Sequence, residues 1–321
     1  MAAPPAPLTD AEKDHFITHG WLRLKNCFTR EQAAAATADV WTRLGMDPSD
    51  KATWTRERIH MAHHREFDAA EFAPRAWAAV SELCGGEDRI MPWTRQWRDS
   101  LIVNLGTPEG ESKTVEPRDL KGWHVDGDFF VHYLDSPEQA LLVIPLFTDI
   151  VPGAGGTIIC PEAIPKVAKY LFDNPEGVSP IMQPRSHPQF PRVPFNSSET
   201  GWFYEVAQSC ENFVEATGEV GDVYLLHPLM LHSASNNALR HVRIITNPPI
   251  GLKDPFCFDR ADGQYSLVEK TTLRALGRDN LSGWAIKGLR EGVVPDRVKI
   301  QEEMKRGELE RLTAREANVA A

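Results

Sequence analysis

A mainly β fold flanked by helices is the class that the sequence predicts. Short apolar runs separated by turn residues fill the middle of the chain, whereas helix-start signals gather toward both ends. The glycine-rich stretch 153–156 neither matches Gly-x-Gly-x-x-Gly nor opens a helix, which disfavours a doubly wound nucleotide-binding sheet. Central strands with helices at the ends fit a double-stranded β-helix, a jelly roll of the cupin-like kind. We expect one domain over 1–321, with helical flanks at about 8–90 and 265–318 and a jelly-roll core at about 93–250.

Composition and charge narrow the functional classes. The 321 residues carry 35 Lys and Arg against 45 Asp and Glu, and the resulting net charge of -10 argues against nucleic acid or an anionic membrane surface as a partner. No apolar run is long enough to span a membrane, and Met1 to Pro7 lacks the basic and apolar regions of a signal peptide. The five scattered cysteines fit neither a disulfide framework nor a zinc site. We expect a cytoplasmic protein with reduced thiols, as a monomer or homodimer.

The N-terminal flank carries two capping boxes, in which an N-cap Thr is followed three residues later by Glu or Gln. The first box, Thr9 to Glu12, predicts a helix that ends near Gly20 and precedes a strand at 21–24. The second, Thr29 to Gln32, predicts one helix that continues to a C-cap at Gly45. Beyond it we expect irregular polar chain at 46–69 and a helix at about 71–84.

Strand signals dominate the centre of the chain. Strands are expected at 100–105, 139–150, 157–160, 213–227 and 242–248, and a helix at 161–172. Two loops rich in Pro and Gly, 106–121 and 183–203, are expected to form a mobile lid. A third capping box, Ser266 to Glu269, predicts a helix ending at Gly277. The final helix, at 295–316, is highly charged, and we expect it on the surface.

The chemistry is organised around His124 and Asp126. Residues i and i+2 of an extended strand point to the same face, so this imidazole and this carboxylate can coordinate one metal ion. A distal stretch offers His227 and His232 as a second imidazole, followed by Asn237 and Arg243. Two histidines and one carboxylate on one face of a metal are typical of non-haem Fe(II) oxygenases. The guanidinium of Arg243, eleven residues after His232, suits a dicarboxylate cosubstrate, because it can bind a carboxylate through two parallel hydrogen bonds.

The distal motif resembles that of the phytanoyl-CoA dioxygenase family of Fe(II)- and 2-oxoglutarate-dependent oxygenases. The family pattern is Gly-Asp, a His eleven residues after that Gly, an Asn five residues after the His and an Arg eleven residues after it. The matching positions here are Gly221-Asp222, His232, Asn237 and Arg243. The resemblance spans most of the chain, beginning at an N-terminal pattern of Leu8-Thr9, Phe16 and Gly20-Trp21.

This resemblance implies that His124, Asp126 and His232 hold Fe(II) and that Arg243 binds the far carboxylate of 2-oxoglutarate. It further implies that 2-oxoglutarate and O2 are consumed with release of succinate and CO2. Thr157 and Asn104 stand on strands where the family places further 2-oxoglutarate contacts. Two positions depart from the family: Ala234 stands where a Ser is common, and Val125 where a Gln is common.

Members of the family act on acyl-CoA thioesters, free amino acids, alkaloids and terpenoids. A CoA ester would require a basic patch, and no clear one stands out in a chain of net charge -10, so the expected substrate is a small molecule of specialised metabolism. Hydroxylation is the default reaction, and desaturation, epoxidation or ring formation would use the same residues. Halogenation is disfavoured, because halogenases of this type lack the carboxylate that Asp126 supplies.

Competing assignments exist within the same stretches. His227 with Arg240 could replace His232 with Arg243, but their spacing is thirteen residues and His227 precedes Pro228, so we interpret His227 as a core histidine. Asp128 could replace Asp126, although residues i and i+4 of a strand lie too far apart to share an ion easily. A cluster of His60, His63 and His64 is interpreted as surface or lid residues rather than metal ligands.

Two functions of other classes stay open at this point. One is a cupin-type iron enzyme that does not use 2-oxoglutarate, against which Arg243 speaks. The other is a catalytically degenerate jelly-roll binding protein, which would bind neither iron nor cosubstrate.

Overall fold

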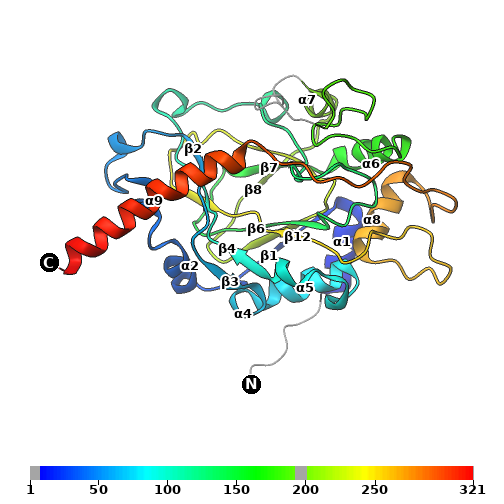
Figure 1. Cartoon of the computed structure of the whole chain (residues 1–321), viewed down its shortest axis with the longest axis horizontal. Coiled ribbons are helices and arrows are strands. Elements are labelled where there is room, and N and C mark those ends of the chain that lie inside the picture. Colours follow the sequence, from blue (N-terminus) through cyan, green and yellow to red (C-terminus); the bar gives the residue numbers. More distant parts are fainter. Residues whose placement is uncertain (1–7, 192–200, 321) are drawn as a thin grey trace.

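A core of antiparallel strands with helices around it is the architecture of the chain (Figure 1). The computed structural model describes residues 8–191 and 201–320. Every strand pair in these ranges is antiparallel. The strands are Trp21–Leu24 (β1), Arg58–His60 (β2), Glu66–Asp68 (β3), Gln96–Arg98 (β4), Ile102–Asn104 (β5), Leu141–Pro145 (β6), Thr157–Cys160 (β7), Val214–Ala216 (β8), Val223–Leu226 (β9), Leu231–Ala234 (β10), Arg243–Ile245 (β11) and Pro249–Ile250 (β12).

The strands form four sheets. Their orders are β1-β9-β6-β12, β10-β7-β8, β11-β5-β2 and β3-β4. Every residue of β6, β7 and β9 is buried, so these strands lie at the centre of the packing. Single bridges join the sheets, including Leu146 to Ile245 between the ends of β6 and β11. Strand β11, which carries Arg243, is thereby joined to the sheet that contains β6 and β9.

The helices lie mainly toward the two ends of the sequence. Their bounds are Asp10–His19 (α1), Arg30–Thr37 (α2), Val40–Leu44 (α3), Ala69–Phe72 (α4), Pro74–Cys84 (α5), Ile164–Asp173 (α6), Trp202–Gln208 (α7), Leu267–Leu276 (α8) and Arg297–Ala320 (α9). All three capping boxes are confirmed, at Thr9, Thr29 and Ser266. Gly20, Gly45 and Gly277 end their helices in the left-handed conformation, as the sequence predicts.

Several expected boundaries are wrong. The helix expected from 30 to 45 is two helices, because the chain breaks at Ala38 and Asp39 between α2 and α3. The segment 46–69, expected as irregular, contains β2 and β3. Strands of three residues are too short to show an alternating pattern, and they exist here because β5 and β4 supply partners. Strand β10 and helix α7 were not expected either.

One hydrophobic cluster runs through the described chain. It includes buried residues from Leu8 to Leu281 and is contributed by both helical flanks and the central strands. The five cysteines are free, and four of them are buried. No helix among the described residues is long and apolar enough to cross a membrane.

Two members of the distal motif have structural roles. Gly221 adopts a φ of +96°, and a Cβ there would lie 2.2 Å from the carbonyl oxygen of Phe28, so only glycine fits this turn. Asp222 is buried and accepts hydrogen bonds from Arg23 at 2.7 and 2.9 Å. The Gly-Asp pair therefore fastens β9 to the N-terminal strand β1.

The predicted lid loops are placed only in part. Residues 192–200 lie outside the described residues. The segment 106–121 is loop with two short turns of 3-10 helix, and it contacts the chain near Asn236 and Ala238. Within the described parts of 106–121 and 183–203, only Phe203 lines the cavity described below. The lid stays a prediction.

Candidate metal centre and active site

His124, Asp126 and His232 come together in the structure. The backbone of His124 and that of His232 exchange two hydrogen bonds, of 3.0 and 2.9 Å, although the residues are far apart in sequence. This bridge places both imidazoles beside the carboxylate, with each Nε2 3.4 Å from Oδ1 of Asp126. One ligand atom from each residue lies within 4.8 Å of the others. Among the described residues this is the one group of three or more His, Cys, Asp or Glu with such geometry.

Both histidines are held in the tautomer that a metal requires. Nδ1 of His124 lies 2.7 Å from the carbonyl oxygen of Gly122, and Nδ1 of His232 lies 3.0 Å from that of Met230. A carbonyl only accepts, so each Nδ1 carries the hydrogen. Each Nε2 is left with its lone pair directed at the shared site, as in other metal-binding histidines. The donor set therefore fits a divalent transition metal.

Asp126 is kept anionic by its neighbours. In the metal-free protein, burial acts to raise its pKa, but hydrogen bonds from His124 and His232 in their protonated form, together with their positive charge, outweigh burial and lower the pKa well below its usual range. A metal ion at this site would replace the Nε2 hydrogens. For His124, burial acts to lower the pKa, and the interaction with Asp126 outweighs it, so the pKa is raised. The second carboxylate oxygen, Oδ2, accepts a hydrogen bond of 3.2 Å from Nδ2 of Asn247. Oδ1 alone is thus left to face the two imidazoles.

Arg243 is a buried cation without an acidic partner. Its side chain belongs to a residue only 2% exposed, and Nη2 donates to Oγ1 of Thr157 at 2.9 Å. No carboxylate of the described residues lies within 4.0 Å of the guanidinium, and Nε has no acceptor. Burial, with a smaller effect of Arg58, lowers the pKa of Arg243 to about 9. A buried charge of this kind is costly unless an anion joins it.

The strand register places Arg243 near the three candidate ligands. On β7 and β10, His232 pairs with Ile159 and Ala234 pairs with Thr157. Directly paired residues of an antiparallel sheet share a face, as do residues two apart on one strand. Thr157, which holds Arg243, therefore stands on the same face as His232, about 7 Å further along the strand. The small side chain of Ala234 leaves this face open between them.

Asn104 lies across from Arg243 in the β5–β11 register. Its Oδ1 accepts from the backbone N–H of Gly106 at 3.1 Å, and its Nδ2 donates to the carbonyl oxygen of Ser235 at 3.2 Å. One hydrogen of its amide is left for another acceptor. Asn104 and Thr157 remain proposed cosubstrate contacts.

The competing histidine is used elsewhere. Nε2 of His227 lies 3.0 Å from Oγ1 of Thr272, and Nδ1 accepts from the backbone N–H of Leu229 at 3.2 Å. Both ring nitrogens are occupied inside the core, and burial lowers the pKa of His227 to about 3. Arg240 packs over the ring of Trp54 at 5.6 Å, away from the cavity.

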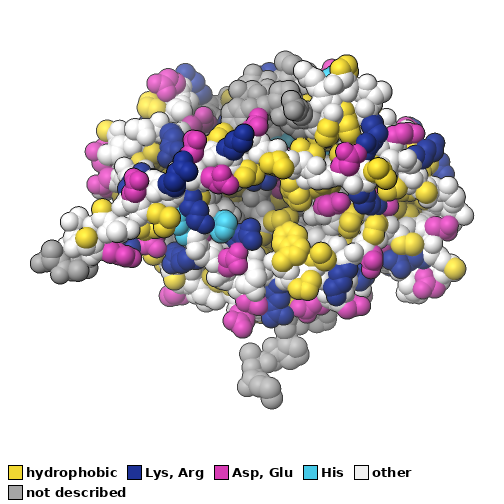
Figure 2. All heavy atoms as spheres, viewed as in Figure 1, with side chains coloured by type: hydrophobic (Ala, Val, Ile, Leu, Met, Phe, Trp, Pro, Cys, Tyr) yellow, Lys and Arg dark blue, Asp and Glu magenta, His cyan; other side chains and the backbone are white. Residues whose placement is uncertain are grey.

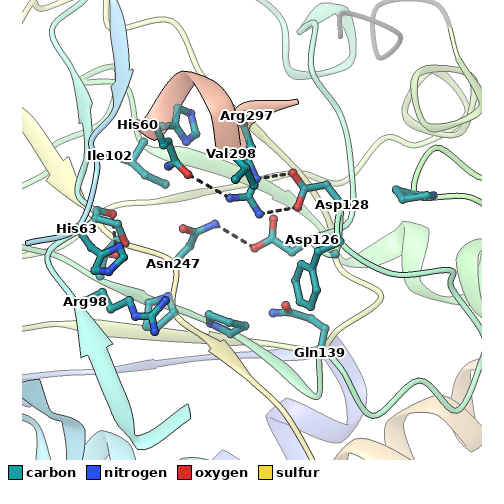
Figure 3. Close-up of a pocket in the computed structure, with 18 of the residues that line it drawn as sticks. His60, His63, Arg98, Ile102, Asp126, Asp128, Gln139, Asn247, Arg297 and Val298 are labelled. Carbon is teal, nitrogen blue, oxygen red and sulfur yellow. Dashed lines mark hydrogen bonds and ion pairs between the residues drawn. The ribbon is translucent and has the colours of Figure 1, made fainter. Parts of the chain in front are cut away.

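Asp128 lines the cavity but already has a partner. Its two oxygens lie 2.5 and 2.7 Å from Nε and Nη2 of Arg297, a bidentate ion pair. Asp126, rather than Asp128, is therefore the carboxylate that faces the imidazoles. Figure 3 shows this arrangement, with Arg297 turned toward Asp128 and Asn247 turned toward Asp126.

A cavity of about 660 Å³ opens beside the candidate ligands. Helix α9 supplies one wall, and its residues Arg297, Val298, Gln301, Glu302 and Lys305 face inward. The helix expected at 295–316 is present and largely exposed, but the sequence did not predict that its inner face lines a cavity. The helix is held by Glu308, which is 1% exposed and binds Nε of Arg43 at 2.9 Å. No local signal reveals this docking, because the partners are 265 residues apart.

Sequence reasoning also missed other cavity residues. Asn247 lies two residues past β11, and its spacing from Asp126 carries no recognisable pattern. His60 and His63, interpreted as surface or lid residues, line the cavity, whereas His64 binds Glu308 at 2.7 Å. Burial, followed by the charges of His124 and Arg243, lowers the pKa of His60 to about 4. The residue as a whole is accessible to solvent, and the walls of the cavity surround its ring.

Comparisons with known proteins give structural neighbours only. No family model matches the chain, and no curated protein matches it. A non-haem α-ketoglutarate-dependent epimerase, SnoN from nogalamycin biosynthesis, is 15% identical, with a TM-score of 0.42 over 90% of this chain and 96% of that one. HygX from Streptomyces hygroscopicus, solved with nickel and 2-oxoglutarate, is 13% identical, with a TM-score of 0.41 over 77% and 88%. EctD from S. alaskensis is 15% identical, with a TM-score of 0.42 over 78% and 79%. At such scores the function of this chain has to be inferred from its own residues.

Proposed function

We propose that the protein is an Fe(II)- and 2-oxoglutarate-dependent oxygenase, related to the phytanoyl-CoA dioxygenase family, that oxidises a small molecule. The observation that carries the proposal is the buried, acid-free guanidinium of Arg243, which donates to Thr157 on the same sheet face as His232. A metal site alone does not need this cation, whereas a dicarboxylate bound at the metal does. The same proposal takes the chain as one domain with a double-stranded β-helix core.

Each residue has a defined task in this proposal. His124, Asp126 and His232 would hold Fe(II), which would also bind 2-oxoglutarate and O2. Arg243 binds the distal carboxylate of 2-oxoglutarate, and the Thr157 hydroxyl holds the guanidinium in place. Asn104 is the further proposed contact. When bound, Fe(II) with 2-oxoglutarate and O2 supplies the oxidising power.

Hydrogen bonds within the chain orient the candidate metal ligands. The carbonyl groups of Gly122 and Met230 fix the two imidazole rings, and Asn247 fixes the carboxylate. Apolar residues of the cavity, including Phe129 and Phe203, exclude water from part of its wall. Hydroxylation is the reaction we expect first, with desaturation, epoxidation and ring formation open to the same residues.

An Arg243 series tests the assignment. Arg243→Ala should weaken 2-oxoglutarate binding by an amount on the order of 2–5 kcal/mol, because it removes a buried charge-assisted contact. Arg243→Lys keeps the charge but loses the paired geometry, so its loss should be smaller. Arg240→Ala is the matched control and should bind 2-oxoglutarate like wild type. The measurement is the 2-oxoglutarate dependence of the visible absorption of the anaerobic Fe(II) complex, with succinate formation as a second readout.

The outcomes separate the three functional classes. If Arg240→Ala loses affinity instead, His227 and Arg240 are the working pair. If Fe(II) binds but 2-oxoglutarate has no effect, the protein is an iron enzyme of another type. If neither Fe(II) nor 2-oxoglutarate binds, the fold serves as a binding module.

A further inference from the structure

Three basic side chains converge on one wall of the cavity. Arg98 comes from β4, Lys305 from α9 and His63 from the loop after β2. Figure 3 shows His63 and Arg98 on the same side of the cavity. In Figure 2, histidine side chains lie in a hollow beneath α9, with Lys and Arg side chains at its border. The three residues are called the basic wall below.

The positive charge of the basic wall is largely uncompensated. Lys305 has no carboxylate within 4.0 Å among residues 8–191 and 201–320. Arg98 binds Glu66 at 2.9 Å, but this pair is half exposed, and exposed pairs hold their partners weakly. Arg297, on the same face of α9, differs because the bidentate contact with Asp128 neutralises it.

The side chain of His63 lies close enough to both cations for their charges to lower its pKa. Burial lowers it first, and the charges of Lys305 and Arg98 lower it further, against weaker opposing effects of Glu66 and Asp99. Around His63 the effect of the two cations therefore exceeds that of the two anions. The cavity as a whole is balanced, because Asp126, Asp128 and Glu302 line it together with Arg98, Arg297 and Lys305. The positive charge is thus local to the basic wall, where it would attract an anionic group of a ligand.

The rest of the cavity is suited to an apolar molecule. Trp93 lines it and is 50% exposed, which is unusual for so large an apolar side chain. Phe129, Ile102 and Pro248 extend the apolar lining. Because His124, Asp126 and the basic wall border one cavity, a molecule held at the wall would present its uncharged part to the candidate metal site.

We propose that the substrate carries an anionic group, a carboxylate or a phosphate, on an apolar body, and that His63, Arg98 and Lys305 bind this group. The proposal deepens the proposed function, on which it rests for the reaction at the metal. It assigns to α9 a role in specificity, since Lys305 and Arg297 stand on its inner face.

Matched probes test the proposal without knowledge of the substrate. The probes are 3-phenylpropanoate, its neutral analogue 3-phenylpropanamide and 2-phenylethyl phosphate, with binding to the full-length, metal-free protein measured by ligand-observed NMR. The wild type should bind one of the two anions about tenfold more tightly than the amide. Which anion it prefers distinguishes a carboxylate site from a phosphate site.

Substitutions in the basic wall test whether the anionic probes bind there. The double variant Arg98→Ala, Lys305→Ala should lose the preference for the anion, and Lys305→Arg should keep it. Lys299→Ala is the matched control, because Lys299 is exposed on the same helix and does not line the cavity. Circular dichroism of each variant establishes that it is folded.

Three outcomes would overturn the proposal: equal binding of anions and amide, binding of none of the probes, or a preference that survives in the double variant. An Arg243→Ala arm separates this proposal from the proposed function. If that variant alone loses the preference, the probes occupy the 2-oxoglutarate site, so the basic wall is not an anion site while the proposed function stands. A preference that depends on the basic wall in a protein that binds no iron would support the anion site and refute the oxygenase.

Discussion

The two candidate histidine ligands are oriented by the same local arrangement. In each, Nδ1 lies against the backbone carbonyl two residues earlier, Gly122 for His124 and Met230 for His232. Such a contact fixes both the tautomer and the ring direction before any metal arrives. The backbone thus prepares the imidazoles, and only the carboxylate of Asp126 depends on a distant side chain, Asn247.

Loss of either imidazole should abolish metal binding without unfolding the protein. His124→Ala and His232→Ala remove one of three ligands from a site at the edge of the cavity. Fe(II) binding, measured anaerobically by calorimetry, should disappear, while the thermal midpoint of the metal-free protein changes little. His227→Ala is the contrasting control: it should retain Fe(II) binding but lose about 1–3 kcal/mol of stability, because Thr272 and Leu229 lose their buried partner. Retained Fe(II) binding in either ligand variant would disprove the assignment.

Asn247 should be a positioning residue for the metal. Its amide holds Oδ2 of Asp126 and thereby leaves Oδ1 for the metal. Asn247→Ala should weaken Fe(II) affinity by about 10–100-fold, the usual effect of removing a group that orients a ligand. Asn236→Ala is the control, since its amide binds the backbone of Gly110 and Lys113 instead. An unchanged Fe(II) affinity in Asn247→Ala would show that Asp126 needs no such support.

At the scale of elements, α9 is the helix whose position matters most for the cavity. Its buried Glu308 binds both Arg43 and His64, and Arg43 also binds Asp99 at 3.0 Å. Arg315, further along, binds Asp39 at 2.6 Å. These contacts fix the helix against α3 and so hold its inner face on the cavity.

Breaking the buried contact should therefore be costly. Glu308→Ala leaves part of the charge of Arg43 without a partner, and loss of one member of a buried pair costs about 3–5 kcal/mol. Urea unfolding measures this loss, and Glu303→Ala, an exposed change on the same helix, should stay within about 0.5 kcal/mol of wild type. Equal stability of the two variants would mean that α9 is not held by Glu308.

At the scale of the whole molecule, buried neutral histidines link stability to pH. Burial lowers the pKa of His227 to about 3 and that of His132 to about 4. In the unfolded chain both residues take up a proton near pH 6.5. Between these values the unfolded state binds more protons than the folded state, so stability is complete above about pH 6.5 and falls as the pH decreases toward 4.

His227 should account for a measurable part of this pH dependence. Between pH 6.5 and 4.5, it should lower the free energy of unfolding by an amount on the order of 2 kcal/mol. The free energy of unfolding of His227→Asn, whatever its absolute value, should therefore depend less steeply on pH in this window than that of wild type. His241→Gln, at an exposed position, should keep the wild-type slope. A wild-type slope in His227→Asn would indicate that acid stability is controlled by other groups.

The features that the sequence determined by itself are local ones. The capping boxes at Thr9, Thr29 and Ser266 act within four residues, and the strand Thr157–Cys160 is bounded by a glycine turn and a proline. The proximity of His124 and Asp126 follows from their spacing of two residues, although the structure places them in a loop with a single bridge at His124 rather than in the expected strand. Each of these rests on dihedral preferences and contacts between near neighbours, which the order of residues specifies directly.

Only the tertiary structure decided the features that depend on distant pairing. It closed the backbone bridge that sets His232 beside His124 and Asp126, and it packed His227, the alternative that the sequence disfavoured, into the core. It brought α9 to the cavity through Arg43, and it left Arg243 buried without an acid. Burial and ion pairing are properties of packed surfaces from separate elements, and no local propensity encodes which surfaces meet. For that reason the residues of the candidate metal site could be proposed from the sequence, whereas the walls of the cavity could not.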